Sequence, residues 1–579
     1  MHRRGAVFSV SMVVVAITAS ACASSSSGGS PSNGSTASSG PNGQVSGLVR
    51  EDINPQPVSN LKQGGSLTYS LDEYATNWNF NEVDGTEASI NTVQQAIMPQ
   101  PFITDAQGNT TPNPDFITSA SVTSTDPQVV EMKLNPSAVW SDGSPITEAD
   151  YATQWQALNG KNKAYQASST TGYSQIKSVA EGSGGKYDVV ITFSKPYADW
   201  KGLFLPLYPG KYQSTPKLFN TGYVNAFPLT AGPFGNPVFN KSAQTVTVTP
   251  NTSWWGDKPV LSKIVFRALT STAANQAFVN GELNDDFDVA VDTADYDTVK
   301  SAKNGNVTLA VGPDYRQFTV SSKHDPLHFM ADEKVRQAVE LGINRDTLIK
   351  SDLKGIPWPI VPLDNHFFMN VQTGYQDNTG NLGTYDPTAA TQLLESDGFT
   401  KDSSGYYAKG GKEINLDFMI PAGIQSSKNE GELTQAMLKQ VGIKVHINAV
   451  PVNDWSDKYL VPGVFDLAPF SWLGTPFPIS SSVSIYSSPK AGGGQNFTGT
   501  ANPQVDSLLH QAISQTDPQQ AIALTNQADK LLWQEVHTIT LFERPQMCGV
   551  TNGLANIGSF GFATPDFTKI GWMKGQPNG

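Results

Sequence analysis

Residues 471–480 are the stretch of this sequence best suited to binding, and they read SWLGTPFPIS. The stretch combines a tryptophan, a glycine and two prolines, and it carries no charge. Turn-forming residues this close to Trp472 predict a loop. The indole offers an apolar face, and the backbone groups of Leu473 and Gly474 can bond a ligand chain. Packing of Trp472 into the protein, as part of a lid, is the alternative.

Motifs of catalysis and phosphate binding are absent from the sequence. There is no G-x-S-x-G elbow, no GxxxxGK[ST] loop, no HExxH and no cysteine pair for zinc. His324 and His328 lie four residues apart, but Pro326 between them disfavours a helical pair of metal ligands. We therefore expect a binding protein without a metal or cofactor, and not an enzyme.

Two acidic clusters deserve the same test. Residues 284–288 read NDDFD, and Asp292, Asp295 and Asp297 follow shortly after. Calcium binding or a glycosidase carboxylate pair would use such residues. We expect turns with solvated charges instead.

Overall charge and length limit the function classes further. The formal net charge of the 579 residues is −13, and no basic run follows residue 4. Nucleic acid is excluded as an expected partner, because phosphate binding needs clustered Lys and Arg. The length predicts two or three domains.

The N-terminus has the pattern of an export signal. Arg3 and Arg4 precede an apolar stretch of about a dozen residues, too short to span a bilayer. Ala19-Ser20-Ala21-Cys22 resembles a bacterial lipobox, which implies cleavage after residue 21 and lipidation of Cys22. An ordinary signal peptide cut at an A-x-A site is the alternative. If Cys22 carries lipid, no disulfide is possible, and Cys548 is predicted to be a buried small apolar residue.

Residues 22–64 are predicted to form a flexible tether, because Ser and Gly dominate their first half. A chain of this kind has a mean reach of roughly 35 Å. We expect a globular body held by a lipid anchor at the outer face of the cytoplasmic membrane.

Hydrophobic periodicity in the body alternates between the two regular types. Strands are predicted over residues 66–71, 129–136, 187–193, 263–269, 287–291, 412–421, 444–451, 465–472 and 539–545. Helices are predicted over 87–98, 150–158, 272–283, 333–343, 384–399, 429–443, 502–515 and 517–536, with a capping box at Thr147 and Asp150. Helix followed by strand, repeated along the chain, indicates an α/β fold.

Six segments resemble, in order, motifs of the family 5 solute-binding proteins of ABC importers, the oligopeptide- and dipeptide-binding class. They are VWSDGSPITEADYATQW, TAGPFG, TSWWGDKPVLSKIVFR, KVRQAVELGINRDTLI, YDPTAATQLLESDGF and NPQVDSLLHQA. Ala231 and Asn344 depart from the family pattern. The resemblance covers residues 65 to about 550.

The resemblance implies a two-lobed periplasmic-binding-protein type II fold with an extra α/β subdomain inserted in lobe I. Lobe I would comprise residues 65–95, 230–317 and 535–579, the insert 96–229, and lobe II 318–534. The chain would cross between lobes near 318–322 and 535–541. A monomer would then close around its ligand and present it to an ABC permease and its ATPase.

The same resemblance gives the opening stretch a role. In peptide-binding relatives a W-x-x-D loop faces the cleft, and its Asp meets the α-ammonium of the peptide. Trp472 aligns with that Trp, and Thr475 stands at the Asp position. A neutral hydroxyl cannot supply a charge-assisted hydrogen bond. Either Asp84 or Glu82 of a first-lobe loop meets the ammonium, or the ligand carries none.

Two functions follow from this reading. The first is capture of peptides for import. The second keeps the fold but binds a neutral glycoside or glycolipid head group, or serves a cell-envelope role without transport.

Overall fold

One mixed sheet runs through the whole molecule. Among the residues that the structure, a computed structural model, describes (47–287, 289–323 and 329–576), ten strands form this sheet in the order β18-β17-β19-β13-β20-β12-β2-β11-β10-β9. In chain order these are β2 (Ser66–Leu71), β9 (Phe234–Asn240), β10 (Thr245–Pro250), β11 (Lys263–Ala268), β12 (Asp285–Asp286), β13 (Gly305–Val320), β17 (Asn415–Pro421), β18 (Lys444–Val450), β19 (Leu467–Leu473) and β20 (Thr538–Thr551).

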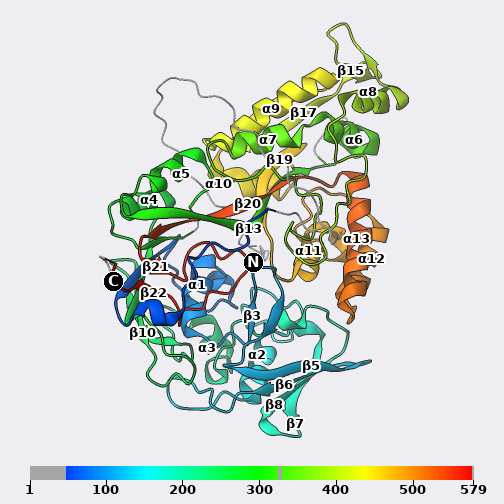
Figure 1. Cartoon of the computed structure of the whole chain (residues 1–579). Coiled ribbons are helices and arrows are strands. Elements are labelled where there is room, and N and C mark those ends of the chain that lie inside the picture. Colours follow the sequence, from blue (N-terminus) through cyan, green and yellow to red (C-terminus); the bar gives the residue numbers. More distant parts are fainter. Residues whose placement is uncertain (1–46, 288, 324–328, 577–579) are drawn as a thin grey trace, which may run out of the picture.

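The two longest strands, β13 and β20, connect the two halves of the molecule. They pair antiparallel from Gly305↔Thr551 to Thr319↔Thr538, with β12 beyond β20 and β19 beyond β13. Figure 1 shows this pair crossing the middle, with α6–α9 on one side and α1–α3 and β5–β8 on the other. We call the half built on β2 and β9–β12 the first lobe, and the half built on β17–β19 the second lobe.

The ladder between β13 and β20 is interrupted near its middle. The register shifts between Val311 and Tyr315, an interval that contains Pro313, which has no N–H to donate. Arg544 Nη1 lies 3.2 Å from Asp314 Oδ2 at the same level. The sequence predicted no strand over residues 305–320, because the Gly-Pro-Asp in its middle reads as a turn.

The first lobe carries a separate four-stranded sheet and five helices among the described residues. The sheet has the order β5-β6-β8-β7. The bounds are β5 (Ile117–Thr125), β6 (Gln128–Leu134), β7 (Ile176–Gly182), β8 (Gly185–Phe193), α1 (Ala88–Ile97), α2 (Glu148–Leu158), α3 (Pro216–Thr221), α4 (Ser271–Val279) and α5 (Thr293–Lys300). The capping box at Thr147 and Asp150 is confirmed, and it opens α2.

The second lobe holds most of the helices. Their bounds are α6 (Glu333–Gly342), α7 (Arg345–Asp352), α8 (Pro387–Ser396), α9 (Gln425–Val441), α10 (Val452–Asp454), α11 (Pro478–Tyr486), α12 (Pro503–Ile513) and α13 (Pro518–Glu535). The helices expected from residue 333 onward are confirmed. Helix α11 was not expected, because its sequence PISSSVSIY is poor in strong helix formers.

Short strands complete the described part. They are β1 (Leu61–Lys62), β3 (Phe102–Thr104), β4 (Thr110–Pro112), β14 (Thr400–Lys401), β15 (Tyr407–Lys409), β16 (Lys412–Glu413), β21 (Leu554–Ala555) and β22 (Gly571–Met573).

Each lobe is built around its own large apolar core. Leu67, Trp78 and Trp140 belong to the first-lobe cluster, and Phe318 and Phe418 to a second-lobe cluster. Burying side chains of this size contributes about 1.5–3 kcal/mol each, so each lobe has ample material for a stable fold. Cys548 is fully buried, as predicted.

Residues 48–62, expected within the tether, lie along the C-terminal segment. Asn54 Nδ2 donates to Leu554 O at 2.8 Å, and Leu61 pairs with Met573 between β1 and β22. Val311 N donates to Val49 O at 2.7 Å, which fixes the start of this segment beside β13. Cys22 and the rest of the first 46 residues lie outside the described residues. Of the helices in the described ranges, none combines the length and apolarity needed to cross a bilayer.

Two expectations about residues 284–291 were wrong. The described residues 287 and 289–291 are not in a strand, because the pairing of β12 ends at Asp286. Asp285 and Asp286 are also buried and not solvated, since β12 is wedged between β2 and β20. Burial, and then the neighbouring Asp286, raises the pKa of Asp285 well above its ordinary value, which favours its neutral form there.

Candidate ligand-binding site

Strand β19 leaves one main-chain edge open where it runs into the loop at 474–480. It pairs with β13 over its whole length, but with β17 only at Leu467. Gly474 N donates to Pro313 O at 2.5 Å, and bonded and non-bonded positions alternate in an antiparallel pair. The N–H and C=O groups of Ser471 and Leu473 therefore point away from β13, and within the described ranges they have no hydrogen-bond partner. An extended chain could bond to this edge.

The side chains of Trp472 and Leu473 lie in contrasting surroundings. The Trp472 indole stacks on Phe497 with ring centroids 5.8 Å apart and meets Phe470 edge-on at 5.0 Å. Only 8% of Trp472 is exposed, against 61% of Leu473. The indole is thus mostly enclosed in this conformation, and Leu473 presents the larger apolar surface.

Gly474 and Thr475 form a turn that is held from several sides. A Cβ at Gly474 would collide with the Met369 side chain and Pro313 O, so the close approach requires glycine. Thr475 Oγ1 accepts a bond from Phe477 N at 3.0 Å. Its carbonyl oxygen accepts a bond from Gln372 Nε2 at 2.9 Å. The Gly474 N–H is already donated, so of the two expected backbone contacts only Leu473 has a free donor.

The first lobe reaches this turn directly. Ser480 N donates to Asp199 Oδ2 at 2.9 Å, and Asp199 follows β8 of the four-stranded sheet. Burial raises the pKa of Asp199, while its bonds from Ser480 act in the opposite direction. The Phe477 ring also lies against Gly202. The loop after β19 is therefore positioned by both lobes.

Glu82 and Asp84 lie in a first-lobe loop that follows β2. Glu82 is 1% exposed, and its Oε2 accepts bonds of 2.8 Å from Asn77 Nδ2 and from Asp84 N. Burial raises the pKa of Glu82 to about 7. Asp84, by contrast, is exposed, and its carboxylate bonds to no other described residue. Glu82 shapes the loop, and Asp84 is the group that remains available to a ligand.

A second pair of carboxyls adjoins this loop and escaped the sequence analysis. Glu87 shares a hydrogen bond with Glu73, and burial, followed by that neighbour, raises the pKa of Glu87 to about 7. No hydrogen bond or ion pair joins the loop at 79–86 to the loop at 471–480 in the described ranges.

The sequence analysis also missed Asp199 and Gln372, because no sequence pattern links segments so far apart in the chain.

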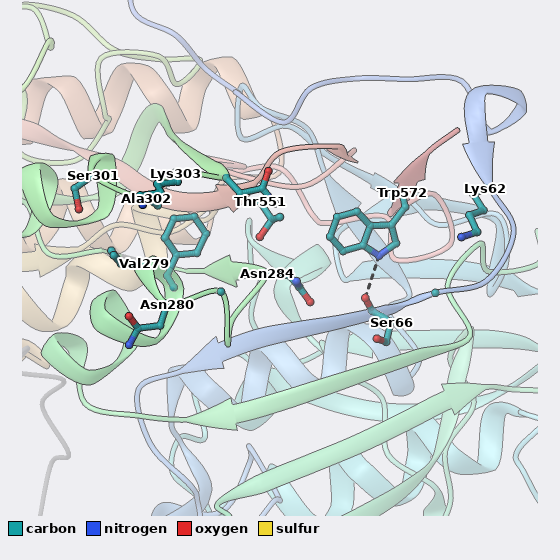
Figure 2. Close-up of a pocket in the computed structure, with 14 residues that line it drawn as sticks. Lys62, Ser66, Val279, Asn280, Asn284, Ser301, Ala302, Lys303, Thr551 and Trp572 are labelled. Atoms are coloured by element: carbon teal, nitrogen blue, oxygen red, sulfur yellow. Dashed lines mark hydrogen bonds between the residues drawn. The ribbon is translucent and has the colours of Figure 1, made fainter. Parts of the chain in front are cut away.

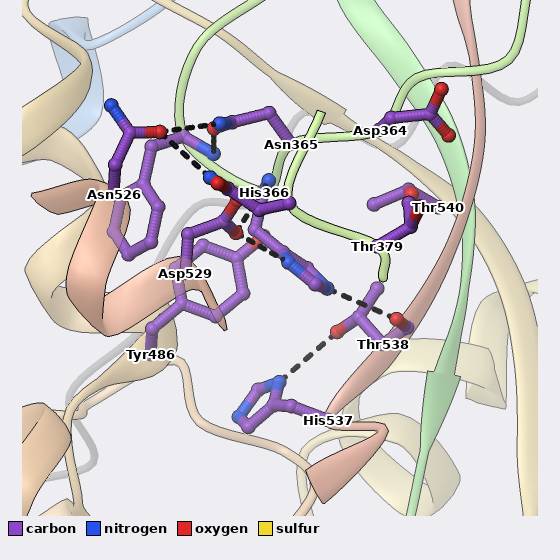
Figure 3. Close-up of polar contacts among 12 residues, drawn as sticks. Asp364, Asn365, His366, Thr379, Tyr486, Asn526, Asp529, His537, Thr538 and Thr540 are labelled. Carbon is purple, nitrogen blue, oxygen red and sulfur yellow. Dashed lines mark hydrogen bonds and ion pairs between the residues drawn. The ribbon is translucent and has the colours of Figure 1, made fainter. Parts of the chain in front are cut away.

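The buried His366 resembles a catalytic base but is enclosed (Figure 3). Its Nδ1 lies 2.7 Å from Asp529 Oδ1, and its Nε2 lies 3.1 Å from the Thr538 carbonyl oxygen. Both side chains of the His–Asp pair are 0% exposed. Since Nε2 is occupied by a backbone carbonyl, this histidine cannot reach a substrate, and the network joins α13, β20 and the loop at 365–378.

The first lobe also contains a hollow of about 850 Å³ (Figure 2). It lies at the Ser66 end of β2, whereas the loop with Glu82 and Asp84 follows the other end of that strand. Lys62, Lys303 and Asn284 line it, and its aromatic residues Phe278 and Trp572 are buried.

The metal site considered from the sequence at His324 and His328 lies outside the described residues.

The chain resembles known proteins in sequence. Residues 111–494 match the model of the bacterial extracellular solute-binding proteins, family 5. The chain is similar to the oligopeptide-binding protein OppA of Mycobacterium tuberculosis (strain H37Rv), with 35% identity covering 90% of this chain and 87% of that protein. It is also similar to the "Probable monoacyl phosphatidylinositol tetramannoside-binding protein LpqW" of the same organism, with 26% identity covering 60% of this chain and 57% of that one.

The fold has solved counterparts. The periplasmic EDTA-binding protein EppA superposes with a TM-score of 0.79 and 25% identity, covering 91% of this chain and 99% of that chain. The fold is therefore the two-lobed type II periplasmic-binding-protein fold predicted from the sequence motifs.

Proposed function

The chain belongs to family 5 of the bacterial extracellular solute-binding proteins, a family of binding proteins and not of enzymes, and on that premise we propose that it captures peptides between its two lobes. The lobes close about the interrupted β13/β20 pair, and the closed form is presented to an ABC permease with its ATPase.

The open edge of β19 is the observation that carries the proposal. Free N–H and C=O groups at Ser471 and Leu473 match the main-chain groups of an extended peptide, which add as a further strand. Backbone bonding of this kind accepts many sequences, and exposed Leu473 would contact one side chain of the peptide. The oligopeptide-binding relative at 35% identity supports the same class of ligand.

The amino terminus of the peptide is met away from Thr475 in this proposal. The Thr475 hydroxyl is neutral and is already bonded to Phe477 N. Asp84 is the exposed carboxylate of the first-lobe loop, and Glu82 holds that loop in place. The small part of the Trp472 indole that stays exposed would also contact the ligand.

A neutral glycoside or glycolipid head group is the second candidate ligand. Two observations support it. The chain is similar to the probable tetramannoside-binding protein, and the uncharged turn at Thr475 suits hydroxyl groups. In that case a cell-envelope role without transport is the corresponding function.

The anchoring and the division into lobes complete the proposal. The protein is extracytoplasmic, like its relatives. We assign residues 1–21 to a signal peptide, Cys22 to lipidation, and the residues after it to a tether on the outer face of the cytoplasmic membrane. The body acts as a monomer, with lobe I at 65–95, 230–317 and 535–579, the insert at 96–229, and lobe II at 318–534.

Thermal unfolding with peptide and oligosaccharide panels tests the proposed ligand. A ligand present at 100 times its Kd should add about 2.7 kcal/mol to the free energy of unfolding. We expect peptides of mixed sequence to raise Tm and mannosides to leave it unchanged. Stabilisation by mannosides alone would favour the second candidate and reject peptide capture.

A further inference from the structure

Helix α11 (Pro478–Tyr486) follows the candidate ligand loop and lacks an N-terminal cap of its own. Its N-cap residue is Phe477, whose side chain has no acceptor. Pro478 at the first helical position has no N–H, and Ser481 N donates to Phe477 O at 3.2 Å. The amides of Ile479 and Ser480 are therefore the ones that a cap would have to satisfy.

Asp199 of the first lobe supplies the missing acceptor. Its Oδ2 accepts the Ser480 N–H at 2.9 Å, and the Ser480 hydroxyl also bonds to this carboxyl. A carboxylate at a helix N-terminus is favoured by the helix dipole as well as by the bond itself. The cap therefore comes from a residue 281 positions away in the sequence, across the boundary between the lobes.

Two further contacts hold the same pair of surfaces together. Ala198 N donates to Ile513 O at 2.8 Å, at the C-terminal end of α12. The Phe477 ring packs against Gly202 so closely that a Cβ there would lie 3.0 Å from the ring. The segment 198–202 thus contacts the second lobe at several points, with Asp199 at the centre.

We propose that Asp199 caps α11 in trans in the conformation described above, so that the contact between the lobes orders the turn at 474–478 beside the candidate ligand edge. The inference rests on the proposed function, in which the lobes move relative to each other. Separating Asp199 from Ser480 leaves the first turn of α11 uncapped and the loop after β19 held only from the second lobe. Asp199 is a positioning residue and does not need to touch the ligand.

Hydrogen exchange of the ligand-free protein tests this coupling. The variants are Asp199→Ala, Asp199→Asn, which keeps one acceptor oxygen, and Ser480→Ala, which keeps the N–H. Glu181→Gln, on the exposed surface of the same subdomain, is the matched control. We expect amides of residues 479–483 to exchange about 2- to 30-fold faster in Asp199→Ala, the range for loss of a helix cap. Asp199→Asn and Ser480→Ala should fall between that variant and the wild type, and Glu181→Gln should match the wild type.

The outcomes separate this inference from the proposed function. Unchanged exchange of α11 in Asp199→Ala would overturn the trans cap, whether or not peptides bind. Faster exchange of α11 in a protein that binds no peptide would support the cap and reject the ligand instead. If Asp199→Ala also loosens α9, which lies at the far end of the second lobe (Figure 1), the milder Asp199→Asn decides between the results. Where peptides bind, their dissociation from Asp199→Ala should accelerate within the same range.

Discussion

Replacing Leu473 by proline should weaken peptide binding without weakening the fold. The Leu473 N–H points to the open edge of β19 and bonds to no described residue, so its removal breaks no bond of the sheet. Proline is tolerated at such edge positions, and Trp472 before it is already extended. A peptide strand on this edge would lose one donor and keep an unsatisfied carbonyl. That loss costs about 1–3 kcal/mol, or about 5- to 150-fold in Kd.

Isothermal titration with one tight-binding peptide measures this effect, and Leu473→Ala is the matched control. The alanine variant keeps the N–H and removes only the side chain, which is 61% exposed. We expect Leu473→Pro to bind more weakly than Leu473→Ala, while both melt near the wild-type temperature. Equal affinities in the two variants would refute strand addition at β19. A large drop in Tm for Leu473→Pro alone would show that the N–H serves the fold.

Three further predictions concern charge and pH. Thr475→Asp should tighten binding of free-amine peptides about 10-fold, as expected for a charge-assisted bond, and leave N-acetylated peptides unchanged in the same titration. Burial, with the charges of His366 and Arg336, lowers the pKa of His537 to about 3, so the unfolded chain takes up a proton first on acidification. In urea unfolding, the free energy of unfolding should fall as the pH is lowered from about 6.5 towards 3. The fall should be less steep in His537→Gln than in the wild type. Burial raises the pKa of Glu543 to about 8, so stability should fall as pH rises from 4.5 to 8, and Glu543→Gln should remove that part of the fall.

The fold was predictable where local signals were strong. The capping box at Thr147, the Asp332 cap of α6 and the prolines that open α12 and α13 each carry their information within a few residues. Strand β13 was missed because Gly312-Pro313 in its middle has the sequence of a turn. Its extended form is imposed by pairing with β20 and β19, which lie more than 140 residues further along the chain.

The candidate site was predictable only as a loop. Trp472 and Thr475 were located from a motif, because their spacing is local. The contacts of Asp199 with Ser480 and of Gln372 with Thr475 join segments 281 and 103 residues apart, which no periodicity reports. The burial of Asp285 could not be predicted either, because the strands that enclose it, β2 and β20, lie far from it in sequence.

The turn at Thr475 explains how the loop keeps its shape without an anion. Thr475 Oγ1 accepts the Phe477 N–H at 3.0 Å and donates to Ser481 Oγ at 3.2 Å, so the hydroxyl is used inside the turn. An aspartate can accept the same Phe477 N–H with one carboxylate oxygen, as Asp does in turns, and direct the other outwards. The two residues therefore allow one backbone shape and differ in what they offer a ligand. Recognition with threonine then depends on the main-chain edge at Ser471 and Leu473, and a free peptide amine is left to Asp84 of the first-lobe loop.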